Sequence, residues 1–270
     1  MSYWVAVRRR LAAIALAGID VAALLINYTG NMTDEIVTMG DGNQYRLLTL
    51  TSSGTLTIEK EVTADVWLCG GGANGGGASA YYDDNSGGGG GFVASSVGQK
   101  IQTETAIVGA AAGASSFGSV TANGGNGKNG GSGGGEKAFS STDASGTGAG
   151  VTTYPFEDTS YFSGKPHCAG GGGGDYLYNS TKHRGGAGGT NGSNGSRRIS
   201  NSYGGGVGGT LGGGTGAQVI SSMPRNGGNA TFYGSGGGGA SIYRNAMSTV
   251  SGGSGYQGVI YVRIPLNQAA

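Results

Sequence analysis

The sequence GNATFYGSGGGGASIY, which spans residues 228–243, shows the pattern that decides how this chain folds. A run of four glycines lies between two short segments that carry aromatic side chains. The same alternation extends from Asn123 to Gln257, and a shorter glycine field lies upstream between Gly70 and Gly91. The whole chain has 63 glycines in 270 residues, which is about three times the ordinary frequency. Glycine at this density indicates either a flexible linker or closely packed extended segments, because it lacks the side chain that keeps backbones apart.

The segments between the glycine runs distinguish these two interpretations. A flexible linker is polar, whereas these runs alternate with aromatic segments, and charged residues make up only 11% of the chain. The lack of a strict Gly-X-Y period excludes collagen. An extended helix with three residues per turn makes no internal hydrogen bonds, so its backbone groups must pair with neighbouring segments. We therefore expect a packed bundle of polyglycine-II helices. The aromatic segments are Tyr154–Phe156, Tyr161–Phe162, Tyr176–Tyr178, Thr231–Tyr233 and Ser241–Tyr243.

Apolar runs on both sides of the glycine field predict β-strands. The last run, Val259–Ile264, must pair with the early strands, because an isolated strand has no hydrogen-bond partners. The chain is therefore expected to be mainly β, with a small antiparallel β base or sandwich that carries the glycine bundle. A turn is expected near Gly98, and the passage from Thr29 to Asn43 is rich in turn residues. The predicted strands are Tyr45–Thr51, Thr55–Ile58, Asp65–Cys69, Phe92–Val97, Thr103–Val108, Ser116–Ala122 and Val259–Ile264.

Residues 1–43 are interpreted as an N-terminal attachment segment, and residues 44–270 as the glycine-rich domain. The apolar run Leu11–Ile26 follows the basic cluster Arg8–Arg10 and is interrupted by Asp20. It is shorter than the roughly 20 residues that span a bilayer, so we expect a short apolar helix that docks on another protein. Packing on the chain's own domain, a signal peptide and membrane insertion are the alternatives. The predicted attachment residues are Trp4, Leu11, Ile14, Leu24 and Leu25.

Charge and cysteine content exclude several classes of function. The net charge of +1 gives no general attraction to nucleic acid or to an anionic membrane. Two cysteines, Cys69 and Cys168, are too few for a disulfide framework. They could form a bridge only if their backbones meet, and buried thiols are the favoured state.

Motifs typical of enzymes occur in this chain, but its composition explains them. Gly125–Gly130 matches the dinucleotide-binding pattern, yet such matches are frequent at this glycine content and no helix follows. His167 and His183 are the only histidines, which excludes a histidine-rich metal site. The acidic pairs Asp83-Asp84 and Glu157-Asp158 are expected to be solvated loop carboxylates. The sequence therefore predicts no enzyme, no cofactor and no metal.

Several ordered motifs outside the glycine runs carry a resemblance to a known family. They are Leu47–Thr57, Asp65–Leu68 before a glycine run, Ala106–Gly109, Ser115–Gly125 and Gly258–Ile264. Over residues 44–264 the chain resembles the glycine-rich domain of tailed-phage tail and tail-fibre proteins. Related polyglycine-II bundles occur in the adhesins that cap the long tail fibres of T-even-type phages. The resemblance implies a β base, a bundle of glycine helices and variable loops that contact the host receptor. Residues 1–43 match no part of that family.

The resemblance implies a receptor-binding adhesin on the phage tail, exposed outside the cell as part of the virion. Its loops would bind a bacterial surface protein or glycan, and residues 1–43 would dock on a tail or fibre protein or on copies of themselves. No nucleic acid partner and no stable membrane insertion are expected. Tyrosine-rich loops suit binding because tyrosine offers apolar area and a hydroxyl at low entropic cost. The predicted receptor-binding residues are Tyr81, Tyr82, Asp83, Asp84, Tyr176, Tyr178, His183, Arg184, Tyr243 and Arg244.

Two other functions are compatible with the sequence. A structural connector of a phage tail or surface layer would use the bundle only as a spacer, and a flat bundle face would suit ice binding. The position of the aromatic segments distinguishes adhesin from connector. An adhesin is expected to gather them at one exposed end, whereas a connector is expected to bury them or spread them evenly. We expect about half of the rings to cap apolar ends of the bundle.

Overall fold

The computed structural model describes residues 19–77, 86–127, 129–131, 134, 154–165, 167–174, 176–178, 181–183, 213–214, 216–217, 225–243 and 249–268. Within these residues the regular secondary structure consists of β-strands, apart from a short 3-10 turn, η1 (Pro155–Glu157). The strands are β1 (Ile19–Asp20), β2 (Ile26–Tyr28), β3 (Met32–Thr38), β4 (Gln44–Leu50), β5 (Gly54–Cys69), β6 (Val93–Ile107), β7 (Ser115–Phe117), β8 (Val120–Ala122), β9 (Tyr176–Tyr178), β10 (Thr181–His183), β11 (Ile242–Tyr243), β12 (Val259–Pro265) and β13 (Asn267–Gln268).

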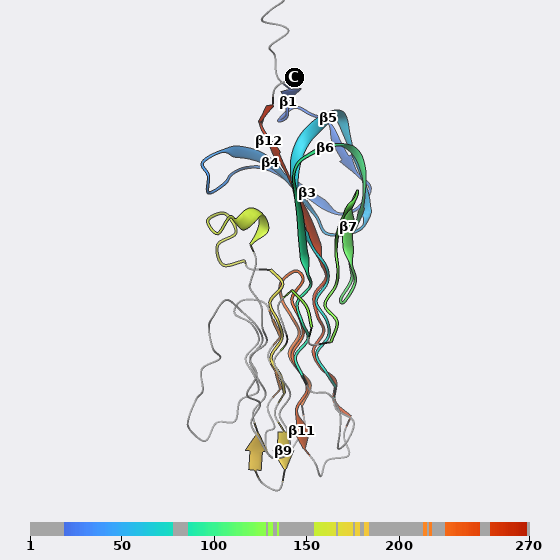
Figure 1. The fold of residues 1–270 in the computed structure, drawn as a ribbon, viewed down its shortest axis with the longest axis vertical. Helices are drawn as coiled ribbons and strands as arrows, with labels where there is room; N and C mark the ends of the chain where they lie inside the picture. Colours follow the sequence, from blue (N-terminus) through green and yellow to red (C-terminus); the bar gives the residue numbers. More distant parts are fainter. Residues whose placement is uncertain are drawn as a thin grey trace, which may run out of the picture.

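Eight of the described strands form one antiparallel sheet, called here the large sheet (Figure 1). Its order is β3-β4-β12-β5-β6-β7-β8, and β2 pairs with the first part of β5. The late strand β12 lies between β4 and β5, so that Tyr261 is the register partner of both Thr49 and Trp67. The prediction that the closing strand pairs with the early strands is therefore confirmed.

The central strands of the large sheet bury side chains on both faces. Leu68 and Val262 belong to one apolar cluster, while their neighbours Trp67 and Tyr261 belong to the other. The first cluster also contains side chains of β2, β6, β7 and β8, so the sheet curves around it. The second cluster packs against residues 154–168. Burial on both faces explains why β12 reads as a continuous apolar run rather than an alternating one.

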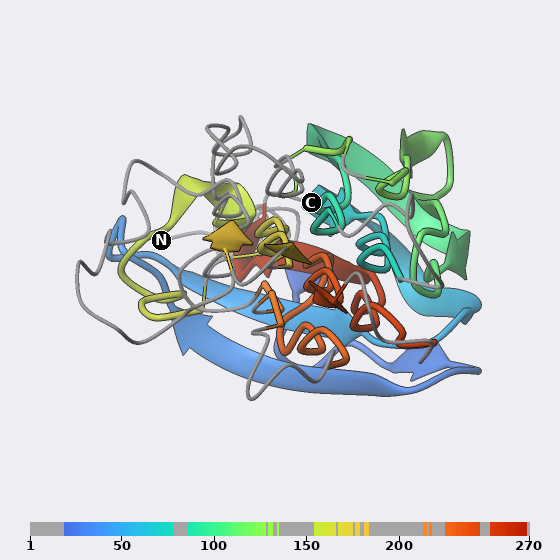
Figure 2. The same ribbon diagram turned by 90° about the horizontal axis from the view of Figure 1, so that it is seen from below.

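The glycine-rich segments form a bundle that extends from one end of the large sheet (Figure 1). β5 continues into residues 70–77, residues 86–92 lead into β6, and residues 249–258 lead into β12. Cys69 on β5 is the register partner of both Val93 on β6 and Val259 on β12. The glycine segments next to these three strand ends therefore lie side by side. The end-on view in Figure 2 shows the segments as adjacent tight coils.

Residues 234–241 lie at the centre of the bundle. Backbone hydrogen bonds of 2.7 to 3.0 Å join them to six other segments of the described chain. Each neighbour makes two such bonds, spaced three residues apart; Gly236 and Gly239, for example, donate to Ala169 and Gly172. The segment of Gly253 and Tyr256 makes a third bond, in which Gly234 donates to the carbonyl of Gln257. The neighbouring residues are Ala73 and Gly76, Gly88 and Gly91, Ala169 and Gly172, Gly214 and Ala217, Arg225 and Gly228, and Gly253 and Tyr256.

Glycine is required where these segments touch. A Cβ atom on Gly237 would lie 1.9 Å from the carbonyl oxygen of Gly253, and a Cβ atom on Gly236 would lie 2.0 Å from that of Gly88. Both distances are far below van der Waals contact, so the missing side chain permits the close approach that the hydrogen bonds need. The high glycine content is therefore explained by packing between backbones.

Several strand predictions are corrected by the structure. β5 is one long strand that covers two predicted strands. β6 is also a single strand, because the expected turn near Gly98 is a bulge in which the Gly98 N–H donates to Asp65 Oδ1 at 2.9 Å. The predicted strand Ser116–Ala122 is a hairpin of β7 and β8 that turns at Gly118, where φ is +54°. β3 lies in the passage that was expected to be rich in turns.

The N-terminal helix expected over Leu11–Ile26 is wrong for its described part, which is strand and turn. β1 pairs with β13, and the chain then turns into β2. Asp20 closes this turn by accepting from the N–H of Ala23 through both its carbonyl and its side chain. Arg46 holds the turn by donating to the carbonyls of Val21 and Leu24 at 2.9 and 2.7 Å. Residues 11–18 lie outside the described residues.

The boundary between residues 43 and 44 falls in the connection between β3 and β4, which pair along their whole length. Residues 19–43 therefore contribute strands to the large sheet. None of the helices in the described ranges combines the length and apolar character needed to cross a bilayer.

Candidate functional site

A three-stranded sheet, called here the distal sheet, lies at the end of the bundle away from the large sheet (Figure 1). β9 is its central strand, with β10 antiparallel on one side and β11 parallel on the other. β9 follows the run Gly170–Gly174, and β11 follows the run Gly236–Gly239. The register places Tyr176 opposite both His183 and Ile242. Two interruptions of the glycine field that are distant in sequence therefore meet at one end of the molecule.

The distal sheet brings together four of the predicted receptor-binding residues. Tyr176 and Tyr178 lie on β9, His183 lies on β10, and Tyr243 lies on β11 opposite Leu177. Strand pairing thus gathers predicted residues from two separate parts of the sequence. The other predicted receptor-binding residues, Tyr81, Tyr82, Asp83, Asp84, Arg184 and Arg244, lie outside the described residues.

Other aromatic segments lie where the bundle meets the large sheet, a region called here the junction. Phe162 is buried and packs edge-to-face on Tyr261, with 5.2 Å between ring centroids. Tyr233 stacks on His167 with a centroid distance of 6.0 Å. Tyr154, Phe156 and Tyr161 pack against the same cluster. These rings cap the sheet-side end of the bundle, as expected for part of the aromatic residues.

His167 is a structural group of the junction. Only 2% of it is exposed, its Nε2 lies 3.1 Å from the Tyr261 hydroxyl, and the ring of Trp67 lies 5.4 Å away edge-on. Burial lowers the pKa of His167 to about 4, so the ring is neutral near pH 7. Burial also raises the pKa of Tyr261 above its usual range. Sequence position did not distinguish this histidine from His183, because both lie between glycine runs.

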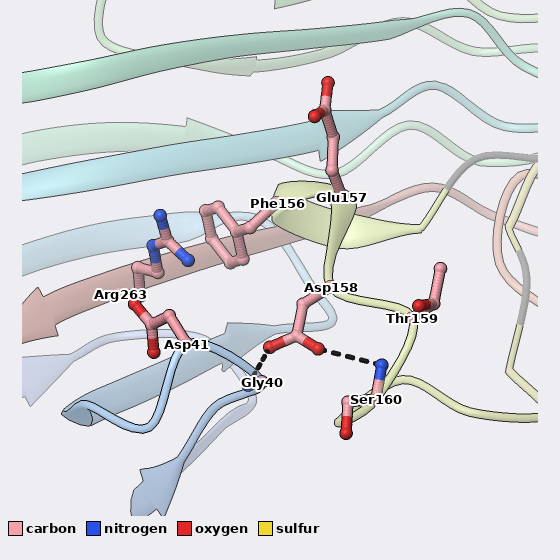
Figure 3. Close-up of a pocket in the computed structure, with 8 residues that line it drawn as sticks. All are labelled: Gly40, Asp41, Phe156, Glu157, Asp158, Thr159, Ser160 and Arg263. Atoms are coloured by element: carbon pink, nitrogen blue, oxygen red, sulfur yellow. Dashed lines mark hydrogen bonds between the residues drawn. The ribbon is translucent and has the colours of Figure 1, made fainter.

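A cleft of about 380 Å³ opens beside the junction, between η1 and the turn that follows β3 (Figure 3). Its lining residues are Gly40, Asp41, Phe156, Glu157, Asp158, Thr159, Ser160 and Arg263. Figure 3 shows that Asp158 points toward the backbone of Gly40, while Arg263 lies against the ring of Phe156.

Hydrogen bonds within the protein engage the main charged groups of this cleft. The Asp158 carboxylate accepts from the backbone N–H groups of Gly40 at 2.7 Å and of Ser160 and Tyr161 at 2.9 Å. Burial alone would raise the pKa of Asp158, but these three bonds outweigh it and leave the pKa lowered. Arg263 donates to Asp65 at 2.9 Å. The bond between Asp158 and Gly40 therefore stabilises the contact between residues 154–165 and the turn that follows β3.

Two acidic residues of the cleft show what the sequence could not reveal. The Tyr45 hydroxyl donates to Asp41 at 2.6 Å, and this bond is the main cause that lowers the pKa of Asp41 to about 2. Asp158 was expected to be a solvated loop carboxylate, but its partner Gly40 lies 118 positions away. A contact between residues so distant leaves no local pattern in the sequence.

The predicted attachment residues that the structure describes lie in different environments. Leu24 is 6% exposed and packs in the core of the large sheet, whereas Leu25 is 72% exposed. The burial of Leu24 agrees with the alternative that part of the segment packs on its own domain. Trp4, Leu11 and Ile14 lie outside the described residues.

The described ranges contain no group of three or more His, Cys, Asp or Glu side chains placed to hold a metal ion. No family model matches the chain, and no curated protein matches it.

Proposed function

We propose that this chain is a receptor-binding adhesin of a phage tail, which recognises a bacterial surface protein or glycan through the loops of its distal end. The observation that carries the proposal is the distal sheet. It places Tyr176, Tyr178, His183 and Tyr243 together, at the end of the bundle farthest from the large sheet (Figure 1). Loops on a rigid scaffold are where binding residues are found most often.

The glycine bundle provides the rigid scaffold. We infer that its segments are polyglycine-II helices, because hydrogen bonds between neighbours recur at every third residue and this helix has three residues per turn. Residues 234–241 are bonded to neighbours on all sides, which leaves little freedom for the segment that carries β11. Loops on a rigid scaffold vary more in sequence than the elements that they connect.

The predicted binding surface combines tyrosines with charged and polar partners. It consists of Tyr81, Tyr82, Asp83, Asp84, Tyr176, Tyr178, His183, Arg184, Tyr243 and Arg244. A surface with both aromatic and charged groups suits a protein loop or a glycan, because rings provide contact area and the charges provide direction.

Adsorption to host cells tests this proposal. Replacing Tyr82, Tyr178 and Tyr243 together by alanine is expected to reduce binding to intact bacteria at least about tenfold, or about 1.4 kcal/mol, with a nearly unchanged melting temperature. Tyr256→Ala serves as a matched control, since Tyr256 is 39% exposed and its ring contacts Tyr233 at the junction. The control variant is expected to adsorb like the parent.

Competition with purified surface polysaccharide separates the two receptor classes. Loss of adsorption of the parent protein under competition would identify a glycan, and unchanged adsorption would indicate a surface protein. Unaltered adsorption of the triple variant would instead support a connector role, in which the bundle only spaces other parts of the tail.

We also propose that the N-terminal segment attaches the adhesin to a tail or fibre protein, or to a second copy of itself. Residues 1–18 are the part of this segment that precedes the first described strand, β1. Attachment of this kind would place the distal sheet outermost on the virion.

A further inference from the structure

We propose that Cys69 and Cys168 are a modification site, where oxidation forms a reversible disulfide that ties the large sheet to the glycine bundle. The two thiols face the same glycine. A Cβ atom built on Gly234 would lie 2.7 Å from Cys168 Sγ and 3.0 Å from Cys69 Sγ. The two sulfur atoms are therefore at most 5.7 Å apart, the sum of these distances.

The backbone brings the cysteines together from distant parts of the chain. Cys69 is the last residue of β5 and is held between β6 and β12. Cys168 opens the glycine segment 168–174, and its N–H donates to the carbonyl of Tyr233 at 3.0 Å. Because Tyr233 precedes Gly234, the same turn that positions Cys168 also passes beside Cys69.

Two residues of this contact have unusual backbone angles. Cys168 has a φ of +62° and Gly234 a φ of +69°. A positive φ is uncommon for a residue with a side chain, and it costs conformational energy that the surroundings must offset. At Gly234 the lack of a side chain leaves the space that both sulfur atoms share. The local conformation thus brings the two thiols toward one point.

The reaction is a two-step exchange with a low-molecular-weight disulfide such as oxidised glutathione. The thiolate of one cysteine attacks a sulfur of the reagent and releases one reduced thiol. The thiolate of the second cysteine then attacks the protein-bound sulfur, which forms the Cys69–Cys168 bond and releases the second thiol. The pair loses two electrons and two protons, and the reagent is reduced to two thiols. A dithiol such as dithiothreitol reverses the reaction.

The bridge has a measurable consequence for stability. It closes a loop of about 100 residues, and a loop of this length strongly restricts the unfolded chain. For a domain of this size we expect the melting temperature to rise by at least about 5 °C. The sulfur atoms are buried, so the exchange proceeds through local opening of the junction and is slow at room temperature.

The experiment compares the parent protein with Cys69→Ala and Cys168→Ala. Each protein is incubated for several days with oxidised glutathione a few degrees below its melting temperature, and then digested without reduction. Mass spectrometry of the parent is expected to find a linked peptide that contains both cysteines, with the loss of two hydrogen atoms. Thermal unfolding is expected to show a higher melting temperature for the oxidised parent only, and dithiothreitol should return it to the starting value.

The other outcomes would overturn the proposal. Unreacted thiols, or a glutathione adduct on one cysteine with no cross-link, would show that the two side chains only fill space beside Gly234. A cross-linked protein that melts at or below the temperature of the reduced protein would show that the bridge does not stabilise the junction. Neither result depends on whether the chain is an adhesin.

Discussion

At the residue scale, the bundle depends on glycines that have no side chain to separate neighbouring backbones. Gly237 donates to the carbonyl of Ala73 at 2.9 Å and accepts from the N–H of Gly88 at 2.7 Å. Its position also leaves 1.9 Å between an added Cβ atom and the carbonyl oxygen of Gly253. Any side chain at this position must therefore move a neighbouring segment and weaken several backbone hydrogen bonds.

The substitution Gly237→Ala tests this dependence. Overpacking against a backbone that cannot yield is expected to lower the free energy of unfolding by about 3 kcal/mol, measured by denaturant unfolding. Gly77→Ala is the matched control, since the nearest atom to an added Cβ there is at 3.1 Å, and it is expected to cost less. Equal and small losses for both variants would contradict the close packing of the central segment.

The buried His167 makes the stability of the protein depend on pH. Its pKa is lowered by burial from 6.5 to about 4 in the folded state, so the unfolded chain binds a proton more readily. Stability is therefore fully present above pH 6.5 and falls as the pH decreases toward 4, by an amount on the order of 3 kcal/mol. Urea unfolding at pH 7, 5.5 and 4 measures this loss.

The variant His167→Phe isolates the contribution of this residue. Asp41 and Asp158, whose pKa values are lowered, change the free energy of unfolding mainly below pH 4. His183 is present in both proteins and cancels in the comparison. The phenylalanine variant is expected to lose less stability between pH 6.5 and pH 4 than the parent. A parallel decline of the two proteins would contradict a buried neutral histidine.

At the scale of elements, the apolar strands were predictable and the polar edge strand was not. The run Val259–Ile264 predicted a buried strand, and β12 lies in the middle of the large sheet. β3 escaped prediction because it carries Asp34 and Glu35 and only β4 pairs with it. Asp34 accepts from Arg46 on β4 at 2.6 Å, a cross-strand contact that the sequence of β3 alone does not indicate.

A glycine in a predicted strand region can mark either a turn or a bulge, and this limited the prediction of where strands end. A turn was predicted at Gly98, but this residue, with a positive φ of +67°, forms part of a bulge inside β6. A bulge and a tight turn both need such a conformation, so a single glycine cannot distinguish them. At the N-terminus, the apolar run Leu11–Ile26, rich in Ala, Leu and Ile, favoured a helix, whereas pairing of β1 with β13 and of β2 with β5 decides the structure of its described part. Long-range pairing overrides local preference there.

At the scale of the whole molecule, the sequence predicted which type of segment forms the candidate site, because the loops and the glycine scaffold differ in composition. Glycine runs indicated where the segments pack, and aromatic interruptions indicated which residues lie between them. The sequence did not indicate which interruptions lie at which end, since the aromatic segments 154–162 and 176–178 both interrupt the glycine field. The order of the segments along the chain makes the difference. Residues 154–168 pack against the large sheet, whereas β9 and β11 each follow a glycine run and lie at the opposite end of the bundle.

Two truncations test how the N-terminal segment relates to the rest of the protein. Residues 1–18 precede β1, so their removal is expected to leave the melting temperature within about a degree while abolishing incorporation into particles. Removal of residues 1–30 also deletes β1 and β2, with the buried side chains of Val21 and Leu24. Loss of two buried aliphatic side chains is expected to cost several kcal/mol, so this variant should melt at a clearly lower temperature. Normal incorporation of the shorter truncation would contradict the attachment role, and equal melting temperatures would contradict the pairing of β1 with β13 and of β2 with β5.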